Sequence, residues 1–307
     1  MRSLLLRDCG GEAAAQVADT PVPAVGPSQV LVGVRAAGIN ALDWKVREGY
    51  VRDAFPLQLP AVLGIELAGV VEAVGAGASR LRIGDRVMGP LGGLGAYADL
   101  VAVDESRLAP TPAGLSDVEA AAIPVAALAA WQSLHVAGPI GAGTRVLVHG
   151  AAGALGSFAV QFARQAGAFV VGTASARDLD HVRGLGADQA IDYASQRFED
   201  LVGDIDLVLA YVGGDVVERS WNVLKPGGTL VGTAAPDFLA RVPAGRRGHW
   251  FVMTPDAALL ETLANDVARG VLKSRIGEVV AFEDLPAAIE RTRLGARGGK
   301  AVVDLTR

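Results

Sequence analysis

Residues 145–168, RVLVHGAAGALGSFAVQFARQAGA, decide the fold class of this chain. An apolar run typical of a strand leads directly into a glycine-rich turn, and a helical pattern follows. Ala151, Gly153 and Gly156 occupy the three positions of the G-x-G-x-x-G fingerprint, with alanine in the first. Such a turn lets backbone amides at a helix N-terminus bind a pyrophosphate. The alternative is an ordinary tight turn, but the strands before and after it favour a dinucleotide site.

Strands and helices alternate around this stretch. Strand-like runs separated by helical patterns follow one another as far as residue 233: 145–148, 169–173, 189–192, 205–211 and 229–232. This alternation predicts a parallel, doubly wound sheet. The residues before 110 instead carry short β-rich runs interrupted by glycine and proline, which predict a second, β-rich domain. A last strand, at 300–305, could return to that domain.

The composition excludes several function classes. The 307 residues are 51% hydrophobic and 20% charged, with a mean hydropathy of +0.35, so we expect folded cores and not a disordered chain. A net charge of −5, without a basic run that contains aromatic residues, argues against a nucleic-acid partner. The single cysteine, Cys9, fits a reducing compartment, and no apolar segment is long enough for a membrane partner. We therefore expect a cytoplasmic protein.

The end of the second strand of the doubly wound sheet indicates which dinucleotide is bound. An acidic residue there binds the ribose 2′-hydroxyl of NAD, whereas neutral or cationic groups accept the 2′-phosphate of NADP. Ser175 stands about where the acid is expected, and Arg177 follows two residues later. This pair favours NADPH. Asp178 next to it carries the opposite charge, and Ser175 could instead cap the next helix.

Eight motifs in order resemble the medium-chain dehydrogenase/reductase superfamily, and within it the zinc-independent quinone oxidoreductase branch that includes zeta-crystallin-like proteins. The resemblance covers essentially the whole chain. The motifs are GINALDWKVREG (38–49), LGIELAGVVEAVG (63–75), GDRVMG (84–89), GAYADLVAV (95–103), AAAIPVAALAAWQSL (120–134), HGAAGALG (149–156), GADQAIDY (186–193) and LKPGGTLV (224–231).

The resemblance implies an α/β protein in which a Rossmann domain with a doubly wound parallel sheet is inserted into a β-rich, GroES-like catalytic domain. We predict the N-terminal part of the catalytic domain, the Rossmann NADP-binding domain and the return to the catalytic domain at residues 1–118, 119–254 and 255–307. NADPH is expected to contact the catalytic segment, the fingerprint turn and the ends of the later strands: Asn40, Ala152, Gly153, Ala154, Leu155, Thr173, Ser175, Arg177, Tyr193, Val212, Gly213, Thr233 and Ala234.

The candidate catalytic residues lie in the segment GINALDWKVREGY, again by resemblance. Asn40 is expected to orient the nicotinamide end, and Asp43 to support Asn40 from behind. Tyr50 carries the hydroxyl that could protonate the product. Trp44 and Tyr50 are predicted to form an aromatic wall of the substrate pocket, with plain packing as the alternative for both. Three neighbours of alternating charge are expected to be solvated: Lys45, Arg47 and Glu48.

Two departures from the family pattern affect the predicted pocket. Ala129 stands where the family usually has a threonine whose hydroxyl approaches the nicotinamide. Ala210 and Tyr211 replace a polar residue and a small residue that commonly precede the V-G-G turn. Tyr211 follows a parallel strand at its carboxyl end, the usual ligand position in such sheets. We therefore predict that Tyr211 belongs to the substrate pocket, with simple filling of space as the alternative.

The sequence predicts no metal site. The zinc alcohol dehydrogenases of the superfamily bind zinc through cysteine and histidine, and the matching positions here hold Asn40 and Ile65, the latter before Glu66. A single glutamate cannot supply the three or four ligands that zinc requires. The four histidines, His135, His149, His181 and His249, are not spaced as a metal site either.

Without a metal to polarise an alcohol, hydride donation to an electron-poor acceptor remains feasible. We therefore expect a zinc-independent, NADPH-dependent oxidoreductase that reduces a small electrophilic molecule, either a quinone or an α,β-unsaturated carbonyl. Two alternatives stay open: a dedicated enoyl reductase of a biosynthetic, polyketide-like pathway, and a non-catalytic NADPH-binding sensor. The family also implies a homodimer.

Overall fold

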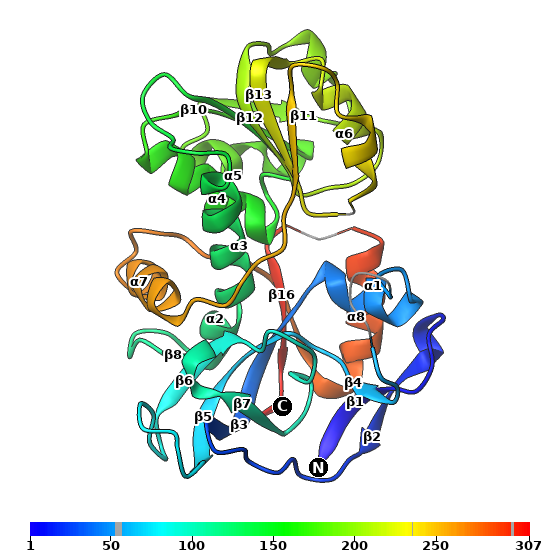
Figure 1. Ribbon diagram of the computed structural model, residues 1–307, viewed down its shortest axis with the longest axis vertical. Helices are drawn as coiled ribbons and strands as arrows, with labels where there is room; N and C mark the ends of the chain where they lie inside the picture. The colour runs from blue at the N-terminus through cyan, green and yellow to red at the C-terminus, as the bar shows by residue number, and fades with distance from the viewer. Residues whose placement is uncertain (53–56, 235, 296–297) are drawn as a thin grey trace. The chain divides into compact units, whose positions relative to one another are not determined.

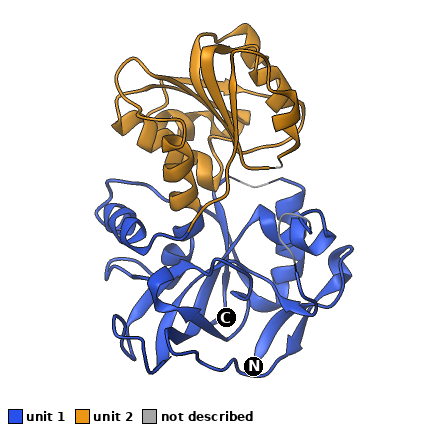
Figure 2. Cartoon of the chain, in the orientation of Figure 1, with its two compact units in different colours: residues 1–125, 255–307 blue, residues 126–254 orange. Residues whose placement is uncertain are grey.

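The computed structural model describes residues 1–52, 57–234, 236–295 and 298–307. The chain divides into two compact units, shown in different colours in Figure 2. Unit 1 contains Met1–Val125 and Pro255–Arg307, and unit 2 contains Ala126–Thr254. The first boundary falls after residue 125, where the sequence analysis set it after 118, and the second falls after residue 254.

Unit 2 is built on a parallel sheet with the strand order β11-β10-β9-β12-β13-β14. Every neighbouring pair in it is parallel, and the first strand in sequence, β9, lies between β10 and β12. The strands are β9 (Arg145–His149), β10 (Phe169–Ala174), β11 (Gln189–Asp192), β12 (Ile205–Ala210), β13 (Leu224–Gly232) and β14 (Arg247–Trp250). The predicted doubly wound sheet is confirmed.

Helices cover both faces of this sheet. In Figure 1, α4 and α5 lie on one face and α6 on the other. The helical segments are α3 (Pro124–His135), α4 (Ala154–Gln165), α5 (Leu179–Gly184), α6 (Asp215–Ser220) and the short 3-10 turns η3 (Ala176–Asp178), η4 (Phe198–Asp200) and η5 (Asp237–Arg241). Because both faces are covered, β9 is a continuous apolar run, and Val146, Leu147 and Val148 are fully buried.

Strand β14 was not expected from the sequence. Its residues, RGHW, contain no alternating or continuous apolar pattern, and most of them are exposed. It forms at the edge of the sheet because its backbone pairs with β13, from Thr229 opposite Arg247 to Gly232 opposite Trp250. An edge strand needs few buried side chains, so hydrophobic periodicity could not reveal it.

Unit 1 contains two sheets. The larger has the order β15-β16-β3-β5-β6-β8, with β7 also paired to β3, and the smaller has the order β2-β1-β4. Their strands are β1 (Arg2–Leu6), β2 (Ala15–Asp19), β3 (Gln29–Ile39), β4 (Ala61–Val62), β5 (Glu66–Val74), β6 (Arg86–Pro90), β7 (Leu100–Asp104), β8 (Ala109–Pro110), β15 (Ile276–Ala281) and β16 (Lys300–Asp304). A continuous apolar core, including Leu4, Val32, Leu67 and Phe282, packs between them.

The last strand returns to the N-terminal part of the chain, as predicted. β16 pairs antiparallel with β3, from Ala301 opposite Ile39 to Asp304 opposite Ala36, and Figure 1 shows the two strands side by side. This pairing brings Lys300, the first residue of β16, to the end of β3. Residues almost the whole chain apart therefore meet in unit 1.

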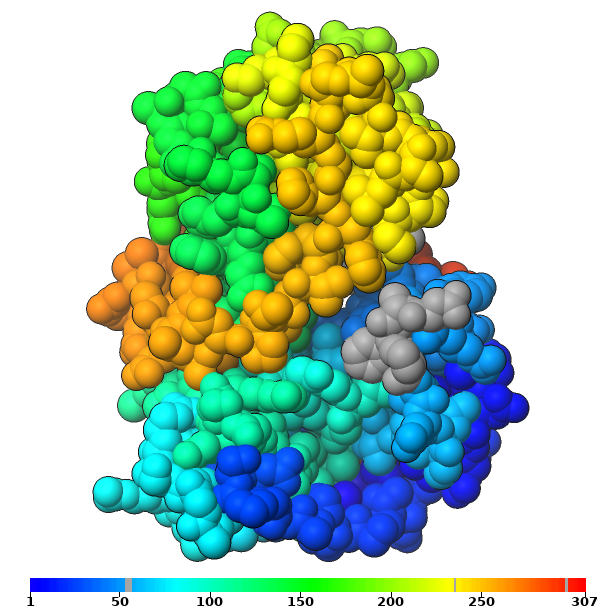
Figure 3. Space-filling model, viewed as in Figure 1, coloured from blue at the N-terminus to red at the C-terminus, as the bar shows by residue number. Residues whose placement is uncertain are grey.

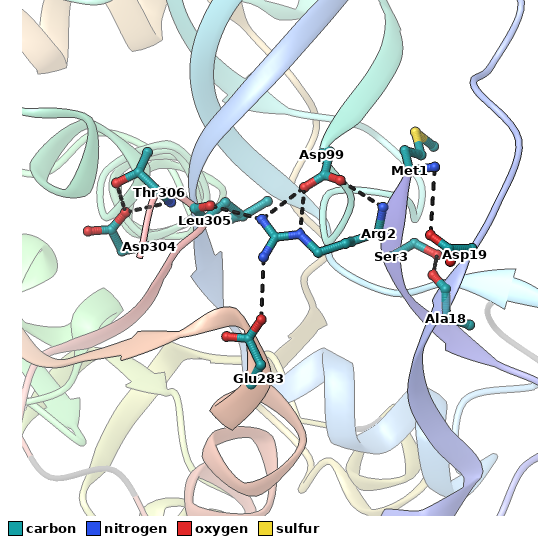
Figure 4. Close-up of polar contacts among 10 residues, drawn as sticks. All are labelled: Met1, Arg2, Ser3, Ala18, Asp19, Asp99, Glu283, Asp304, Leu305 and Thr306. Carbon is teal, nitrogen blue, oxygen red and sulfur yellow. Dashed lines mark hydrogen bonds and ion pairs between the residues drawn. The ribbon is translucent and has the colours of Figure 1, made fainter.

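Arg2 joins the two chain segments of unit 1 (Figure 4). Its guanidinium donates to both sides of the contact: to the Asp99 carboxylate at 3.1 and 3.2 Å, to Glu283 at 3.3 Å and to the backbone oxygen of Leu305 at 3.1 Å. It also lies over the ring of Phe282, 5.1 Å from the centroid. One side chain thus ties β1 to segments near residues 99, 283 and 305.

Helices at the surface complete unit 1. They are α1 (Ala41–Glu48), α2 (Asp117–Ala121), α7 (Ala257–Ala268), α8 (Leu285–Arg293) and the 3-10 turns η1 (Glu12–Ala14), η2 (Glu105–Arg107) and η6 (Phe282–Asp284). In Figure 3, α7, coloured orange, lies at the surface, and it buries only an apolar stripe that includes Leu260, Leu263 and Ala264.

One expectation for α1 was wrong. Arg47 was expected to be solvated, but its side chain is only 1% exposed. It forms ion pairs with Glu48 at 2.7 Å and with Glu290 of α8 at 2.5 Å, because α1 packs against α8. Arg47 therefore pairs α1 with α8, a contact that the spacing of charges along α1 could not predict.

Across the described parts of the chain, none of the helices combines the length and the apolar character needed to cross a membrane.

Candidate active site

The fingerprint turn of unit 2 follows β9 directly. Gly150 adopts a φ of 74°, a conformation that favours glycine, and the Ala151 N–H donates to the backbone oxygen of Thr173 at 3.0 Å. A Cβ on Gly156 would lie 2.1 Å from the Gly150 oxygen, so only glycine allows α4 to approach this turn. Gly153 is the N-cap of α4, and no described side chain caps it. Because the N-cap residue has no side chain, it does not itself bond the first amides of α4, an arrangement common where helix N-termini bind phosphate.

The predicted nucleotide-selecting residues lie just after β10. The Ser175 hydroxyl donates to Asp178 Oδ2 at 2.8 Å, and Arg177 Nε lies 3.4 Å from the same oxygen. Asp178 is buried, whereas most of the Arg177 side chain is exposed. The two groups proposed to read a 2′-phosphate are thus both oriented by one buried carboxylate.

Thr173 lies near the end of β10, and its hydroxyl is buried 3.1 Å from Nδ1 of His149. Its predicted contact with a cofactor stays a prediction. The sequence placed Thr173 at a strand end, but the strand pattern could not show which way its hydroxyl turns.

The other predicted cofactor residues of unit 2 lie along the same carboxyl edge of the sheet. The Tyr193 N–H donates to Ala174 O at 3.2 Å, and the Thr233 N–H donates to Ala210 O at 3.3 Å, so the ends of β10, β11, β12 and β13 lie together. Their exposure runs from buried or half-buried turn residues to exposed loop residues: Ala152, Gly153, Ala154, Leu155, Thr233, Ala234, Tyr193, Val212 and Gly213. This edge is where ligands bind in doubly wound sheets.

Tyr211 also lies at this edge, but its hydroxyl is held by a helix. It forms a hydrogen bond of 2.8 Å with the Ser133 hydroxyl of α3. Burial raises the pKa of Tyr211, so its phenol stays neutral. Ala129, on the same helix, is buried. The Tyr211 hydroxyl is thus held by Ser133, and the place of its ring in a substrate pocket stays a prediction.

Asn40 is the centre of a buried polar cluster in unit 1. It stands between β3 and α1, and its side chain is buried. Its Nδ2 donates to Gly38 O at 3.1 Å and to Glu66 Oε1 at 2.8 Å. Its Oδ1 accepts from Lys300 Nζ at 2.5 Å. The carboxamide is thus bound at both ends.

Glu66 and Lys300 form a buried ion pair at 2.5 Å, with side chains 0% and 3% exposed. The second carboxylate oxygen of Glu66 accepts from the backbone N–H of Val125 at 2.7 Å. Both oxygens of the carboxylate therefore accept hydrogen bonds, and a buried charge is stable only with such partners. We refer to Asn40, Glu66 and Lys300 as the ammonium cluster.

Asp43 lies directly behind Asn40. Its Oδ2 accepts from the Asn40 backbone N–H at 2.7 Å and from the Tyr97 hydroxyl at 2.6 Å. Its Oδ1 is buried without a hydrogen-bond partner among the described residues. Burial is the largest influence on this carboxyl, and it raises the Asp43 pKa from 3.8 to about 6. The raised pKa makes Asp43 a group that changes charge just below neutral pH.

The two aromatic residues predicted for the substrate pocket contact each other in unit 1. The rings of Trp44 and Tyr50 meet edge to face, with centroids 5.9 Å apart. Trp44 is half-buried, and Tyr50 is 73% exposed. The Tyr50 hydroxyl can therefore exchange its proton with solvent.

A metal does not fit the ammonium cluster. Asn40 Oδ1 and Glu66 Oε1, the two side-chain oxygens that could bind a metal there, both accept from the Lys300 ammonium. Within the described ranges, no group of three or more His, Cys, Asp or Glu side chains could hold a metal ion. The cation at this position is therefore supplied by the chain itself.

Family models match both units. Residues 26–113 match the alcohol dehydrogenase GroES-like domain, and residues 185–303 match a zinc-binding dehydrogenase model. The 2-methylene-furan-3-one reductase of Solanum lycopersicum is 35% identical over 294 residues, which cover 92% of this chain and 73% of the relative. The chain belongs to the medium-chain dehydrogenase/reductase superfamily. The predicted oxidoreductase class is thereby confirmed.

Solved structures agree with this assignment. The quinone oxidoreductase from Coxiella burnetii has a TM-score of 0.94 and 30% identity, and the match covers 99% of both chains. The quinone oxidoreductase of Escherichia coli, complexed with NADPH, has a TM-score of 0.89 and 25% identity, covering 99% of this chain and all of that one. This chain is thus a medium-chain oxidoreductase of the NAD(P)H-dependent family.

Three residues that hold the predicted ones in place were not predicted from the sequence: Lys300, Tyr97 and Ser133. Only Lys300 could have been suspected from the sequence, through two charged residues. Glu66 and Lys300 each open a strand and are followed directly by an apolar run, and a charge in such a position needs a partner. Which partner it finds depends on strand order, because β16 reaches Asn40 only by pairing with β3. Tyr97 and Ser133 carry no comparable signal.

Proposed function

We propose that this medium-chain oxidoreductase is a zinc-independent, NADPH-dependent reductase of quinones or α,β-unsaturated carbonyl compounds. The observation that carries the proposal is the ammonium cluster. Lys300 binds the oxygens of Asn40 and Glu66 that could otherwise hold a metal, so these residues leave no Lewis acid to activate an alcohol. The acceptor must therefore be electron-poor already, as quinones and enones are.

NADPH is the proposed cofactor, and it supplies a hydride when bound. Ala154 and Leu155, in the first turn of α4, would hold its pyrophosphate through their backbone amides, since no described side chain caps this helix. Arg177 would donate to the 2′-phosphate, and the Ser175 hydroxyl would do so by turning away from Asp178, to which it now donates. Support comes from the similar Escherichia coli quinone oxidoreductase, whose structure contains NADPH. Asp178 orients both groups but adds a negative charge, so the preference over NADH is a proposal.

In unit 1, the proposed roles follow from the hydrogen bonds of each side chain. Asn40 orients a bound reactant, and Asp43 fixes Asn40 through its backbone N–H. Trp44 and Tyr50 offer an aromatic surface to a flat acceptor. Tyr50, being exposed, can pass a proton from solvent to the reduced product.

Two finer expectations remain predictions. A homodimer is proposed from the family resemblance. A cytoplasmic location is proposed because a chain with one cysteine needs no oxidising compartment.

The proposal is tested by measuring NADPH oxidation, with NADH in parallel, against quinones, enals, cyclic enones and enoyl thioesters. Turnover of a quinone or enone with NADPH is expected, and prolonged chelation should not change it. Preferred turnover of an enoyl thioester would favour the biosynthetic enoyl reductase. Oxidation of an alcohol that chelation abolishes and zinc restores would contradict the proposal. NADPH binding without any turnover would favour the non-catalytic sensor.

A further inference from the structure

The ammonium cluster is a costly feature that folding alone does not explain. Glu66 and Lys300 are both almost completely buried, and removing two charges from water costs several kcal/mol for each ion before their attraction is counted. A pair of apolar side chains at the same positions would commonly be as stable or more so. The cluster must therefore do something that apolar residues could not, and its third member, Asn40, indicates what this is.

Lys300 decides which way the Asn40 carboxamide points. An ammonium only donates hydrogen bonds, so the atom 2.5 Å from Nζ must be the carboxamide oxygen. The opposite end faces Gly38 O at 3.1 Å and Glu66 Oε1 at 2.8 Å, which only accept, so it must be the amide nitrogen. The orientation thus follows from the chemistry of the partners, with no freedom to flip.

This orientation limits what Asn40 can offer to a ligand. Both N–H groups are used, by Gly38 and by Glu66, so Asn40 cannot donate a hydrogen bond to a substrate carbonyl. The oxygen has two lone pairs, and Lys300 uses one of them. What remains is an acceptor, suited to an N–H group such as that of a carboxamide.

We propose that Lys300 is a positioning residue that fixes Asn40 as a hydrogen-bond acceptor toward the bound reactants, with its ammonium as the resident cation of the cluster. This inference rests on the proposed function and deepens it. It assigns the recognition of an N–H group to Asn40 and leaves the developing charge on the substrate oxygen to other groups. It also disagrees with the zinc-binding description of the family model that covers Lys300.

The test uses a double variant, Lys300→Met with Glu66→Gln, which removes both charges together and so avoids an unpaired buried ion. The carboxamide oxygen introduced at position 66 must still accept from the Val125 N–H, so the new NH₂ group takes the place of Glu66 Oε1. A donor then faces Asn40 where an acceptor stood. The variant therefore removes the two contacts, with Lys300 and Glu66, that fix the Asn40 carboxamide, and only Gly38 O still favours the original orientation.

The orientation can be read without turnover. The chain contains three asparagines, Asn40, Asn222 and Asn265, so a sample labelled with ¹⁵N only in asparagine gives three pairs of side-chain amide signals. The Asn40 pair should exchange slowly with water in the wild type, since both protons are bonded in a buried site. In the double variant this pair should shift and exchange faster, with Asn222 and Asn265 as internal references. An unchanged Asn40 pair would overturn the proposal.

Turnover gives the second readout. The double variant should lose about tenfold to a hundredfold in kcat, as expected when a reactant is misplaced. Its NADPH dissociation constant should stay within about twofold, because the fingerprint turn in unit 2 supplies most of the binding. A kcat equal to that of the wild type would also overturn the proposal.

A matched control separates positioning from stability. Arg47 is as buried as Lys300, and it pairs with Glu290 away from Asn40. The variant Arg47→Met with Glu290→Gln should lower the melting temperature at least as much as the double variant and leave kcat unchanged. An equal loss of kcat in both variants would point to general destabilisation and overturn the proposal. If the wild type reduces no acceptor, the proposed function fails, while the asparagine signals still decide whether Lys300 orients Asn40.

Discussion

The two units each bury a polar cluster, but only the cluster of unit 1 contains an ion pair. In unit 2 the Ser220 hydroxyl donates to Val216 O at 2.6 Å, so it must accept from His149 Nε2–H at 3.0 Å. His149 Nδ1 then accepts from the Thr173 hydroxyl at 3.1 Å. These three side chains form a neutral hydrogen-bond network in which each group has a partner, and the network joins β9, β10 and α6. In unit 1, by contrast, Lys300 and Glu66 stay paired as ions.

The difference between the two clusters indicates which of them is functional. A neutral hydrogen-bond network buries polar groups at a small cost in free energy, and packing alone explains it. A buried ion pair beside acceptor oxygens that can take a further hydrogen bond, Asn40 Oδ1 with one free lone pair and Asp43 Oδ1 with no partner, is a costly arrangement that serves a ligand more readily than a fold. Three predictions test this contrast.

The largest effect is expected from Glu66→Leu. It leaves the Lys300 ammonium buried without a carboxylate, and we expect a loss of about 3–5 kcal/mol in the free energy of unfolding. In the neutral network of unit 2, Ser220→Ala should cost only about 1–3 kcal/mol, because the uncharged His149 ring loses its partner. Urea titrations of both variants at neutral pH measure the difference. Equal losses would show that the two clusters do not differ in kind.

His149 of the unit 2 cluster and Asp43, next to the ammonium cluster, should change stability with pH in opposite directions. Burial lowers the His149 pKa from 6.5 to about 3, so the unfolded chain binds a proton that the folded one does not, and acidification below about pH 6.5 destabilises the protein. Burial raises the Asp43 pKa from 3.8 to about 6, so the folded protein keeps a proton that the unfolded chain loses. The stability due to Asp43 is full below about pH 3.8 and is lost as the pH rises to about 6.

Urea titrations between about pH 4 and pH 6 can separate these contributions. Replacing His149 by Gln should make the slope of unfolding free energy against pH more negative, by up to about 1.4 kcal/mol per pH unit. Replacing Asp43 by Asn should make the slope more positive. Slopes that move in the same direction in both variants would rule out the opposite burial effects.

The smallest effect is expected from an exposed charge. Arg177→Ala should raise the dissociation constant of NADPH about tenfold, the value of one charge-assisted hydrogen bond, and should spare NADH. Arg183→Ala provides the control, since Arg183 is an exposed arginine in the same region that pairs with Asp180. Titration of each cofactor by fluorescence gives the constants. Equal losses for NADPH and NADH would remove Arg177 from the 2′-phosphate site.

The sequence predicted what depends on local pattern. The strands of unit 2 were recognisable because a sheet covered on both faces requires continuous apolar runs, such as Val146 to Val148. The fingerprint turn was recognisable because Gly156 has no substitute where α4 meets Gly150. Asn40 and Asp43 followed from the family resemblance.

What the sequence could not predict depends on long-range pairing. Lys300 reaches Asn40 across 260 positions through the pairing of β16 with β3. Arg47 is buried because α8 covers it, and Tyr211 turns to Ser133 because α3 passes beside β12. Side-chain direction at a strand end, as for Thr173, is set by the neighbouring strand. None of these contacts produces a periodic pattern in the neighbouring sequence from which it could be predicted.

The dependence of unit 1 on its last strand has a consequence during synthesis. A ribosome has produced Asn40 and Glu66 long before it reaches Lys300, and at about 5–20 residues per second the interval is roughly 10–50 s. Throughout that time the nascent chain has a carboxylate destined for burial without its cation, while all residues of unit 2 emerge in one piece. Unit 2 can therefore fold while the chain is still growing, whereas the ammonium cluster closes only when the final strand leaves the ribosome.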